Sequence, residues 1–491
     1  MYYLCGMKQT KVLITGATGV MGGATLELLA AEPERYSLRL LVRDSKGNRR
    51  KLKPYIAGGV EVVWGDLRDP AAVAEAVDDV DVVLHIGGMV SPAADHKPKE
   101  TLEVNVKAAE NIVAAVKARP DADRVRVVYI GSVAQMSMHS EPHHWGRTGD
   151  PQMPAVYDHY GISKIQAERV FAESGLKRWV SLRQSGILHP GLLMKGTDPI
   201  TFHVPLRGVL EWATLEDSAR LMRALCRPEI PEEFWQRFYN IGSGPEYRLM
   251  NHRFEQLLLH AIGCPPPERI FDANWFAVKN FHGCWYADSD RLEQLFHFRE
   301  GVPVEEYFKR MSRRLPWWFK FAPIAPAALI RQFMRRVAMT PRLGTLSWLK
   351  RGDNPDRLRA FFGSREEWER IPGWPDFPLH EPSQQVVNFD HGYDESRPVE
   401  SLSDEALQRA AEFRGGRYLG DGEWECAFGH RFRLSRRTVL LGGHWCPDCL
   451  PNLERGWDYG EESRRNPFLA QVWRLEHPEG DAPYPPEKNP R

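Results

Sequence analysis

Ser132, Tyr160 and Lys164 are residue types that can move a proton to or from a substrate oxygen. Tyr160 and Lys164 are four positions apart in a segment with a helical pattern, so we expect them on one helix face. A phenol with a pKa of about 10 is a poor base at neutral pH, and a nearby cation lowers that pKa. Ser132 ends an apolar segment 28 residues earlier and can donate to the same oxygen. A Tyr-x-x-x-Lys pair alone is common on exposed helices. The prediction therefore depends on the chain order, in which a glycine motif, described next, comes first and Ser132, Tyr160 and Lys164 follow it.

A glycine-rich turn follows the first apolar segment, Lys11–Thr15. Gly16 permits a tight turn, Gly19 lets the backbone approach a pyrophosphate, and Gly22 lets the following helix pack closely on the strand. The helix N-terminus would then bind the pyrophosphate, and a turn without any ligand is the alternative. We expect the dinucleotide to be bound by Gly16, Thr18, Gly19, Val20, Met21, Gly22, Arg43, Asp66, Leu67, Gly87, Tyr160 and Lys164.

The end of the second predicted strand favours NADP over NAD. Arg43 stands where an acid normally binds the ribose hydroxyls, and a guanidinium there would pair with a 2′-phosphate. NAD remains the alternative, because Asp44 could bind the ribose hydroxyls if the register of the strand shifts by one residue. Asp66, after the third strand, is expected to accept from the adenine amino group or to cap a helix.

Four potential metal ligands lie close together late in the chain. Cys426-x3-His430 is followed, after fifteen residues, by Cys446-x2-Cys449. Two close pairs of sulfur and imidazole ligands are typical of a tetrahedral structural zinc site. His444 is a competing fourth ligand, and free thiols in a small core are the alternative. Because a closed site leaves no position for a substrate, we expect zinc to serve folding or partner docking, within a unit separate from the dinucleotide-binding core.

Alternating strand and helix patterns fill the first half of the chain and predict parallel βαβ units. The expected fold class is α/β, a Rossmann doubly wound parallel sheet with a smaller substrate-binding lobe. The domains are expected at 8–310 (lobe mainly 185–310), 311–415 (helical and irregular extension), 416–460 (zinc-ribbon-like module) and 461–491 (C-terminal tail, Pro-rich and extended from residue 475). The strands are expected at Lys11–Thr15, Leu38–Val42, Val60–Trp64, Val80–Ile86, Val125–Ile130 and Trp179–Leu182, and two of the helices near Thr101–Ala118 and Val156–Glu173.

Length and composition set limits on the function. A chain of 491 residues exceeds one core, while 42% hydrophobic and 26% charged residues are ordinary for a globular protein. The formal net charge of zero gives no sign of a nucleic-acid partner. We expect a cytoplasmic protein, because the seven cysteines are an odd number and neither a signal peptide nor a long apolar run is evident.

Several motifs together resemble the extended short-chain dehydrogenase/reductase family, also called NAD(P)-dependent epimerase/dehydratase-like. The resemblance covers about residues 9–300 and implies that Tyr160 is the acid/base, Lys164 its activator and ribose ligand, and Ser132 the donor to the substrate oxygen. The motifs that carry it are Thr15–Gly22, Gly65–Asp69, Asn105-Val106, Tyr129–Ser132, Tyr160–Lys164, Leu182-Arg183 and Tyr239–Gly242.

Two departures from the family pattern guide the choice of reaction. Dehydratases of the family carry Thr-Asp-Glu where this chain has Ser132-Val133-Ala134, and nucleotide-sugar enzymes carry Asn where it has Gly186. We therefore expect an NAD(P)-dependent oxidoreductase that interconverts a carbonyl and a secondary alcohol on a small apolar substrate. A nucleotide-sugar epimerase with tightly bound NAD and an NADP-sensing regulatory protein are the alternatives. Pocket aromatics are expected among Phe202, Trp212, Trp275, Phe276, Phe281 and Trp285.

Residues 316–350 combine aromatic residues with a basic helical face. Such a segment can cover an apolar cleft, lie at a lipid surface or act as a plain packing helix. We expect it over the substrate site or at a membrane surface, and a homodimer is left open.

Overall fold

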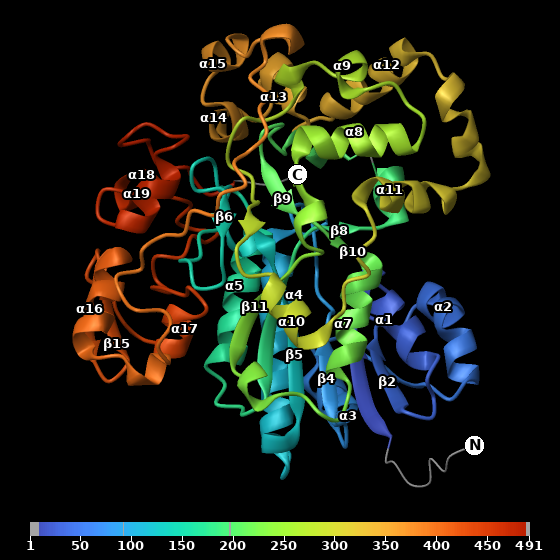
Figure 1. Cartoon of the computed structure of the whole chain (residues 1–491), viewed down its shortest axis with the longest axis vertical. Coiled ribbons are helices and arrows are strands. Elements are labelled where there is room, and N and C mark those ends of the chain that lie inside the picture. Colours follow the sequence, from blue (N-terminus) through green and yellow to red (C-terminus); the bar gives the residue numbers. More distant parts are fainter. Residues whose placement is uncertain (1–8, 92, 196–197, 488–491) are drawn as a thin grey trace.

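A seven-stranded parallel sheet forms the centre of the molecule in a computed structural model, which describes residues 9–91, 93–195 and 198–487 (Figure 1). The strand order is β11-β7-β5-β4-β1-β2-β3, the doubly wound order of a Rossmann fold. The strands are β1 (Thr10–Thr15), β2 (Tyr36–Val42), β3 (Glu61–Trp64), β4 (Val82–His85), β5 (Arg126–Ser132), β7 (Trp179–Gln184) and β11 (Arg237–Ile241).

Helices cover both faces of this sheet, which explains why apolar side chains point to both faces of its strands. In β1, Val12 and Ile14 pack into one core, whereas Leu13 packs into the other. The six predicted strands are all present, with ends shifted by one or two residues, and β11 is an additional strand. The first core includes α1 (Val20–Ala30) and α7 (Leu215–Leu225), the second α3 (Pro70–Val77), α4 (Pro98–Lys117) and α5 (His159–Ala172); α2 (Lys46–Ala57) lies between β2 and β3 in the chain.

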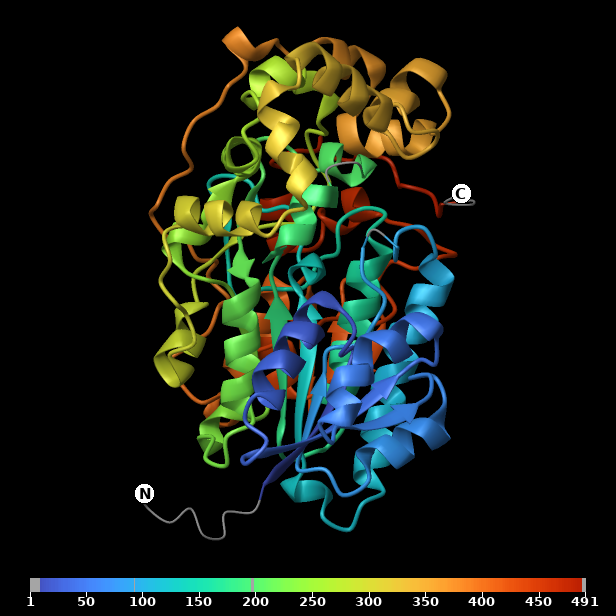
Figure 2. The ribbon, with the colours of Figure 1, turned by 90° about the vertical axis from the view of Figure 1, so that its right-hand side faces the viewer.

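A helical lobe lies over one end of the sheet (Figures 1 and 2). The expected extension shares a core with the substrate lobe, because Met334, Trp348 and Phe361 pack in one cluster with Phe202 and Phe271. The helices of this region are α6 (Pro190–Lys195), α8 (Asn251–Ala261), α9 (Pro267–Ile270), α11 (Val304–Arg313), α12 (Ala327–Ala338), α13 (Thr345–Arg351), α14 (Pro355–Phe362) and α15 (Arg365–Glu369). Among the described residues, no helix has the length and apolarity to cross a membrane.

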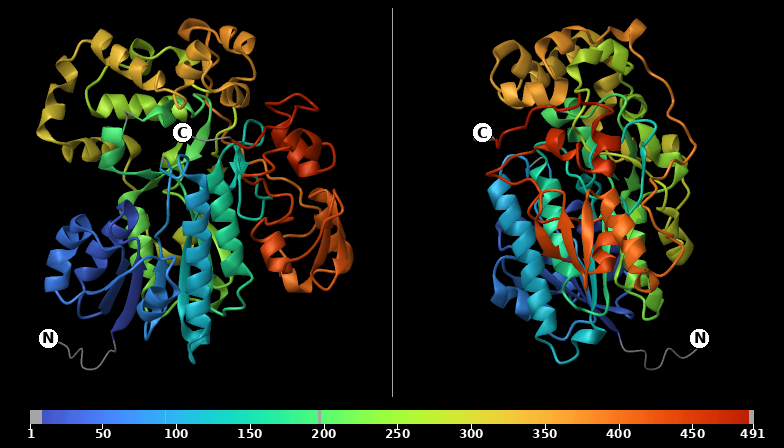
Figure 3. Two further views of the ribbon diagram at one scale, coloured as in Figure 1. Left: turned by 180° about the vertical axis from the view of Figure 1, so that it is seen from behind. Right: turned by 90° about the vertical axis from the view of Figure 1, so that its left-hand side faces the viewer.

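The C-terminal region lies beside the sheet (Figure 3). The three-stranded antiparallel sheet β14-β15-β16 has its own core around Trp424 and Leu407. Up to residue 487, the tail forms no named helix or strand after Trp473, and it packs on the molecule, since Tyr484 is only 2% exposed and contacts Trp473. Residue 8 and residues 488–491 of the expected domains lie outside the described residues. The elements are α16 (Asp404–Phe413), β14 (Gly416–Gly420), β15 (Glu423–Cys426), β16 (Arg431–Arg433), α17 (Arg436–Leu440), α18 (Tyr459–Glu462) and α19 (Pro467–Trp473).

Candidate active site and metal site

A cleft of about 620 Å³ opens where β1, β4 and β5 end. Carboxyl ends of parallel strands are where ligands bind in open α/β sheets. Every residue that the sequence predicted for cofactor binding or catalysis lines this one cleft: Gly16, Thr18, Gly19, Val20, Met21, Gly22, Arg43, Asp66, Leu67, Gly87, Ser132, Tyr160 and Lys164.

The glycine turn of the cleft is built for close backbone approach. Gly16 has a φ of +72°, and a Cβ there would lie 2.7 Å from the Cα of Gly87. A Cβ at Gly22 would collide with the carbonyl oxygen of Gly16. Gly19 is the N-cap of α1 and brings no capping side chain, so the first N–H groups of that helix face the cleft. These features fit a pyrophosphate at the helix N-terminus.

The end of β2 presents one unpaired cation to the cleft. Asp44 forms an ion pair with Arg49, with 2.6 Å between Oδ1 and Nε, and Asp66 pairs with Arg68 at 2.9 Å. Within the described part of the chain, the exposed Arg43 guanidinium forms no hydrogen bond or ion pair. Because Asp44 is already engaged by Arg49, the arrangement fits a phosphate better than a pair of ribose hydroxyls.

Ser132, Tyr160 and Lys164 lie near one another along the cleft. Burial raises the pKa of Tyr160, and the hydrogen-bonding Ser132 hydroxyl acts in the opposite direction. Lys164 Nζ donates to the carbonyl oxygen of Ile130 at 2.8 Å and lies 5.8 Å from the centre of the Tyr160 ring. Burial lowers the pKa of Lys164 to about 8, and the Glu168 carboxylate opposes that shift. The lysine is therefore cationic at neutral pH and close to a neutral phenol.

Glu168, one turn after Lys164 on α5, is the centre of a fully buried polar network. Its carboxylate pairs with Arg183 of β7 at 2.8 Å, and both side chains are 0% exposed. Gln135, which accepts from the Ser132 N–H, donates to Glu168 at 2.8 Å. His444 Nε2 reaches the same carboxylate at 2.9 Å from the C-terminal region. The region expected as a separate zinc module thus completes a network around the helix that carries Tyr160 and Lys164.

His282 is a site residue that the sequence prediction missed. Its Nδ1 lies 2.9 Å from Oδ2 of Asp158, the N-cap of α5, and its ring stacks on Phe281. His282 lines the cleft that holds Tyr160 and also lines the neighbouring cavity. Asp158 and His282 are 124 positions apart in the chain, so no spacing signal in the sequence could have shown this contact.

Comparisons with known proteins agree with this geometry. Residues 12–183 match the model of the NAD dependent epimerase/dehydratase family. These residues carry a domain of that family. The UDP-N-acetylglucosamine 4,6-dehydratase (inverting) of Campylobacter jejuni is 29% identical over 105 residues, which are 21% of this chain and 31% of that protein. The UDP-glucose 4-epimerase of Rickettsia massiliae is 31% identical over 116 residues, 21% of this chain and 32% of that protein.

The match to these two curated relatives spans about a third of their length. Among solved structures, the dTDP-glucose 4,6-dehydratase of Bacillus anthracis in complex with NAD gives a TM-score of 0.50 at 12% identity. That alignment covers 67% of this chain and 99% of the other. At this identity the structural match supports the fold of the family domain and its lobe.

A second cavity of about 510 Å³ adjoins the cleft of the family domain. The two spaces share the wall residues Ser91, Val133, Gly186, Leu192, Trp212 and His282. Most of its lining is apolar and comes from the lobe and from residues 319–334, including Phe254, Phe271, Phe319, Ile330 and Phe333. Residues of the 316–350 segment therefore form part of the wall of this cavity.

The Trp212 ring fills the space beside Gly186, the position at which the resemblance led us to look for the asparagine of nucleotide-sugar enzymes. A Cβ at Gly186 would lie 2.7 Å from the Trp212 ring, which stacks on Phe254 with 4.4 Å between ring centres. Of the six aromatic residues expected in the pocket, Trp212 and Phe281 line the cavity. The other four are buried in packing clusters: Phe202, Trp275, Phe276 and Trp285.

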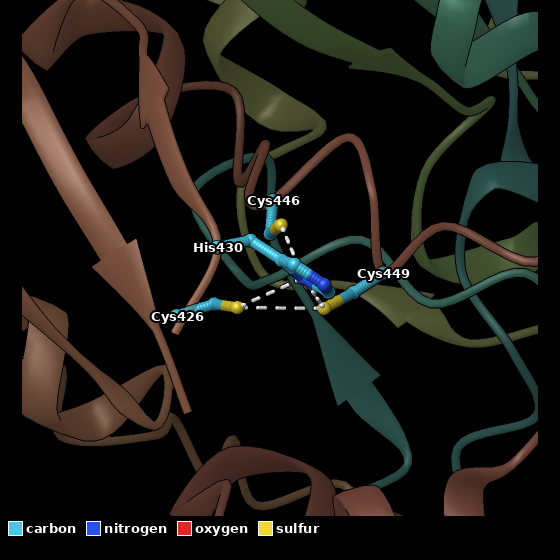
Figure 4. A group of neighbouring side chains, drawn as sticks. All are labelled: Cys426, His430, Cys446 and Cys449. Atoms are coloured by element: carbon cyan, nitrogen blue, oxygen red, sulfur yellow. Dashed lines mark hydrogen bonds between the residues drawn. The ribbon is translucent and has the colours of Figure 1, made fainter. Parts of the chain in front are cut away.

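The four predicted zinc ligands converge in the C-terminal region (Figure 4). Their ligand atoms all lie within 4.8 Å of one another, and His430 Nδ1 is 3.4 Å from Cys426 Sγ, 3.7 Å from Cys446 Sγ and 3.4 Å from Cys449 Sγ. Tetrahedral zinc bonds of about 2.0–2.3 Å place ligand atoms about 3.6–3.8 Å apart. The donor set therefore fits zinc, while His444, the competing ligand, bonds to Glu168 instead.

Proposed function

We propose that this chain is an NAD(P)-dependent oxidoreductase that interconverts a carbonyl and a secondary alcohol on a small apolar substrate. The observation that carries the proposal is the apolar cavity that adjoins the Ser132, Tyr160 and Lys164 cleft. Its volume of about 510 Å³ lies in the usual range for small-molecule sites.

The residues of the cleft divide the chemistry among them. A bound nicotinamide supplies or accepts the hydride at the substrate carbon. In the reducing direction the Tyr160 hydroxyl gives its proton to the substrate oxygen, and in the oxidising direction the phenolate takes it back. Ser132 donates a hydrogen bond to that oxygen, and the Lys164 cation favours the phenolate form. Gln135, itself bonded to Glu168, holds the Ser132 backbone, and the Glu168 carboxylate favours the cationic form of Lys164.

A nucleotide-sugar epimerase with tightly bound NAD is the second candidate, favoured by the similarity to a UDP-glucose 4-epimerase. The Trp212 ring against Gly186 argues against it, because it leaves no room for the asparagine of such enzymes. Dehydration lacks support, since Val133 and Ala134 bring no acid or base. Protein purified with cofactor bound would favour the epimerase, whereas freely exchanging cofactor would favour the dehydrogenase. The third candidate is an NADP-sensing regulatory protein. The presence of Ser132, Tyr160 and Lys164 argues against it, because a sensor does not need catalytic residues.

Replacing Tyr160 with phenylalanine tests the proposed reaction. The assay measures the turnover of apolar ketones with NADPH through the nicotinamide absorbance. We expect the variant to lose turnover and to retain cofactor binding, because the phenol acts on the substrate. Tyr157→Phe, three residues earlier, is the matched control. Turnover within tenfold of the unmodified chain would remove Tyr160 from the mechanism.

We propose NADP as the preferred cofactor, because the Arg43 guanidinium is free to pair with a 2′-phosphate. We also propose that Cys426, His430, Cys446 and Cys449 bind a structural Zn²⁺.

A further proposal is contact of residues 316–350 with a membrane surface. It is supported by exposed apolar side chains such as Trp317, which is 67% exposed, and Ile324. Liposome flotation of the chain and of a Trp317→Ala variant tests this contact. Absence of binding would leave these residues as a wall of the cavity.

A further inference from the structure

Helix α8 carries a carboxyl group on its apolar face. The residues of α8 and its end that line the cavity recur with helical spacing, which defines one stripe: Asn251, Phe254, Glu255, Leu258, Leu259 and Ile262. Glu255 stands in the middle of this stripe, where a leucine would pack. It is 5% exposed, so the carboxyl is buried together with the apolar wall.

No protein group within the described ranges satisfies this carboxyl. Over the described residues, the structure shows neither a hydrogen bond nor an ion pair to the Glu255 side chain. Burial alone raises its pKa to about 8, with no charged neighbour contributing. Two other polar residues of the same wall bond to nearby backbone groups: Asp198 accepts from Ile200 N–H, and Asn251 donates to the Val204 carbonyl. A buried polar group without a partner is costly, and this one lines the cavity.

We propose that Glu255 hydrogen-bonds a second hydroxyl group on the substrate, so that the cavity takes an apolar hydroxy ketone or diol. This inference rests on the proposed function and names the substrate class of the same site. Glu255 lines the cavity but not the cofactor cleft, so it lies away from the wall that the two spaces share. The reacting carbonyl meets Tyr160 at one end, and the distal hydroxyl meets Glu255 at another.

A hydroxyl fits this position better than a plain hydrocarbon or a phosphate. It can donate to and accept from a neutral carboxyl, whereas a phosphate would meet an acid with no cation beside it. A site built to hydrogen-bond a hydroxyl strongly disfavours the analogue that lacks it, because the buried partner is then left unpaired. Glu255 is thus a specificity-determining residue that discriminates between otherwise similar apolar ketones.

Binding of matched ketones tests the inference without turnover. The probes are androstan-17-one with 3-hydroxyandrostan-17-one, and 2-dodecanone with 12-hydroxy-2-dodecanone, titrated by calorimetry. We expect at least one hydroxylated member to bind about tenfold more tightly than its partner. Glu255→Leu should abolish this preference while retaining the plain ketone, and Glu255→Gln should preserve part of it. Glu27→Gln, which changes an exposed carboxylate, should leave binding unchanged, and circular dichroism verifies that each variant is folded.

Equal binding within both pairs, binding of none of the probes, or a preference that survives Glu255→Leu would overturn the inference. Tighter binding of the 3-amino steroid than of the 3-hydroxy steroid would also overturn it, in favour of a cationic ligand. Failure of the proposed function has a different signature. A hydroxyl preference without NAD(P)H-dependent turnover would refute the oxidoreductase alone, whereas turnover without a preference would refute the role of Glu255 alone.

Discussion

Replacing Glu255 with glutamine should stabilise the folded chain by an amount that grows with pH. The ordinary pKa of this carboxyl is 4.5, and burial raises it to about 8 in the folded chain. Between these two values the unfolded chain has released the proton while the folded chain still holds it. A rise in pH therefore favours the unfolded state, and glutamine, which cannot ionise, removes this dependence.

The magnitude follows from the difference between the two pKa values. Each pH unit between them changes the free energy of unfolding by about 1.4 kcal/mol. The interval from 4.5 to about 8 therefore corresponds to at most about 5 kcal/mol, reached near pH 8 and constant above it. Below about pH 4 the dependence vanishes, because the carboxyl is neutral in both states. The amide of the glutamine can also change the free energy of unfolding through its packing. That change is the same at every pH, so it does not affect the pH dependence.

Urea unfolding at pH 5, 6, 7 and 8 provides the assay. Fluorescence of the sixteen tryptophans, among them Trp212, which stacks on Phe254 of α8, follows the transition. The difference in free energy between Glu255→Gln and the unmodified chain cancels other titrating groups, and Glu27→Gln serves as the exposed control. A difference that stays constant across this range, or that falls with pH, would show that Glu255 is ionised or paired, and the reasoning would fail.

Three further predictions concern the cofactor, the metal and the buried network. Arg43→Asp should shift the preference from NADP(H) toward NAD(H) in fluorescence titrations, and tighter NAD(H) binding by the unmodified chain would refute the assignment. Metal analysis should find about one zinc per chain. The Cys446→Ser variant should lose both the zinc and the protease resistance of residues 416–460, whereas the control variant Cys264→Ser should keep both. A metal-free chain in which these residues still resist protease would contradict the site. Glu168→Gln should cost about 3–5 kcal/mol in urea unfolding because it leaves Arg183 buried without its anion, and a loss under 1 kcal/mol would argue against the network.

The sheet could be predicted from the sequence because its signals are local. Each apolar run is a strand buried on both faces, and the glycine turn lies directly after the first of them. β11 was missed, although Tyr239–Gly242 belongs to a family motif, because Arg237 and Asn240 interrupt its short apolar run. The helix expected from Val156 begins instead at His159, where Asp158 caps it by accepting from the Gly161 N–H.

The rest of the site depends on contacts that no local pattern carries. Composition pointed to aromatic residues, but it does not distinguish Trp212, which faces the cavity, from Phe202, which packs in the core. The pair of Asp158 and His282 and the isolation of Glu255 both arise from how distant segments pack. The proline-rich tail gave no periodic signal, yet Tyr484 is held in a core by ring contacts with Trp473.

The network around Glu168 also constrains how the chain is made. His444, which completes it, lies 276 residues after Glu168. At synthesis rates of about 5–20 residues per second, the ribosome needs roughly 15–55 s to cover that distance. During this interval the nascent chain lacks one partner of its central carboxylate, and the carbonyl of Gly442, which accepts from Arg183, is missing as well. The Rossmann sheet therefore reaches its final electrostatic state only after the C-terminal region emerges, and chains truncated before residue 442 would retain the unfinished network permanently.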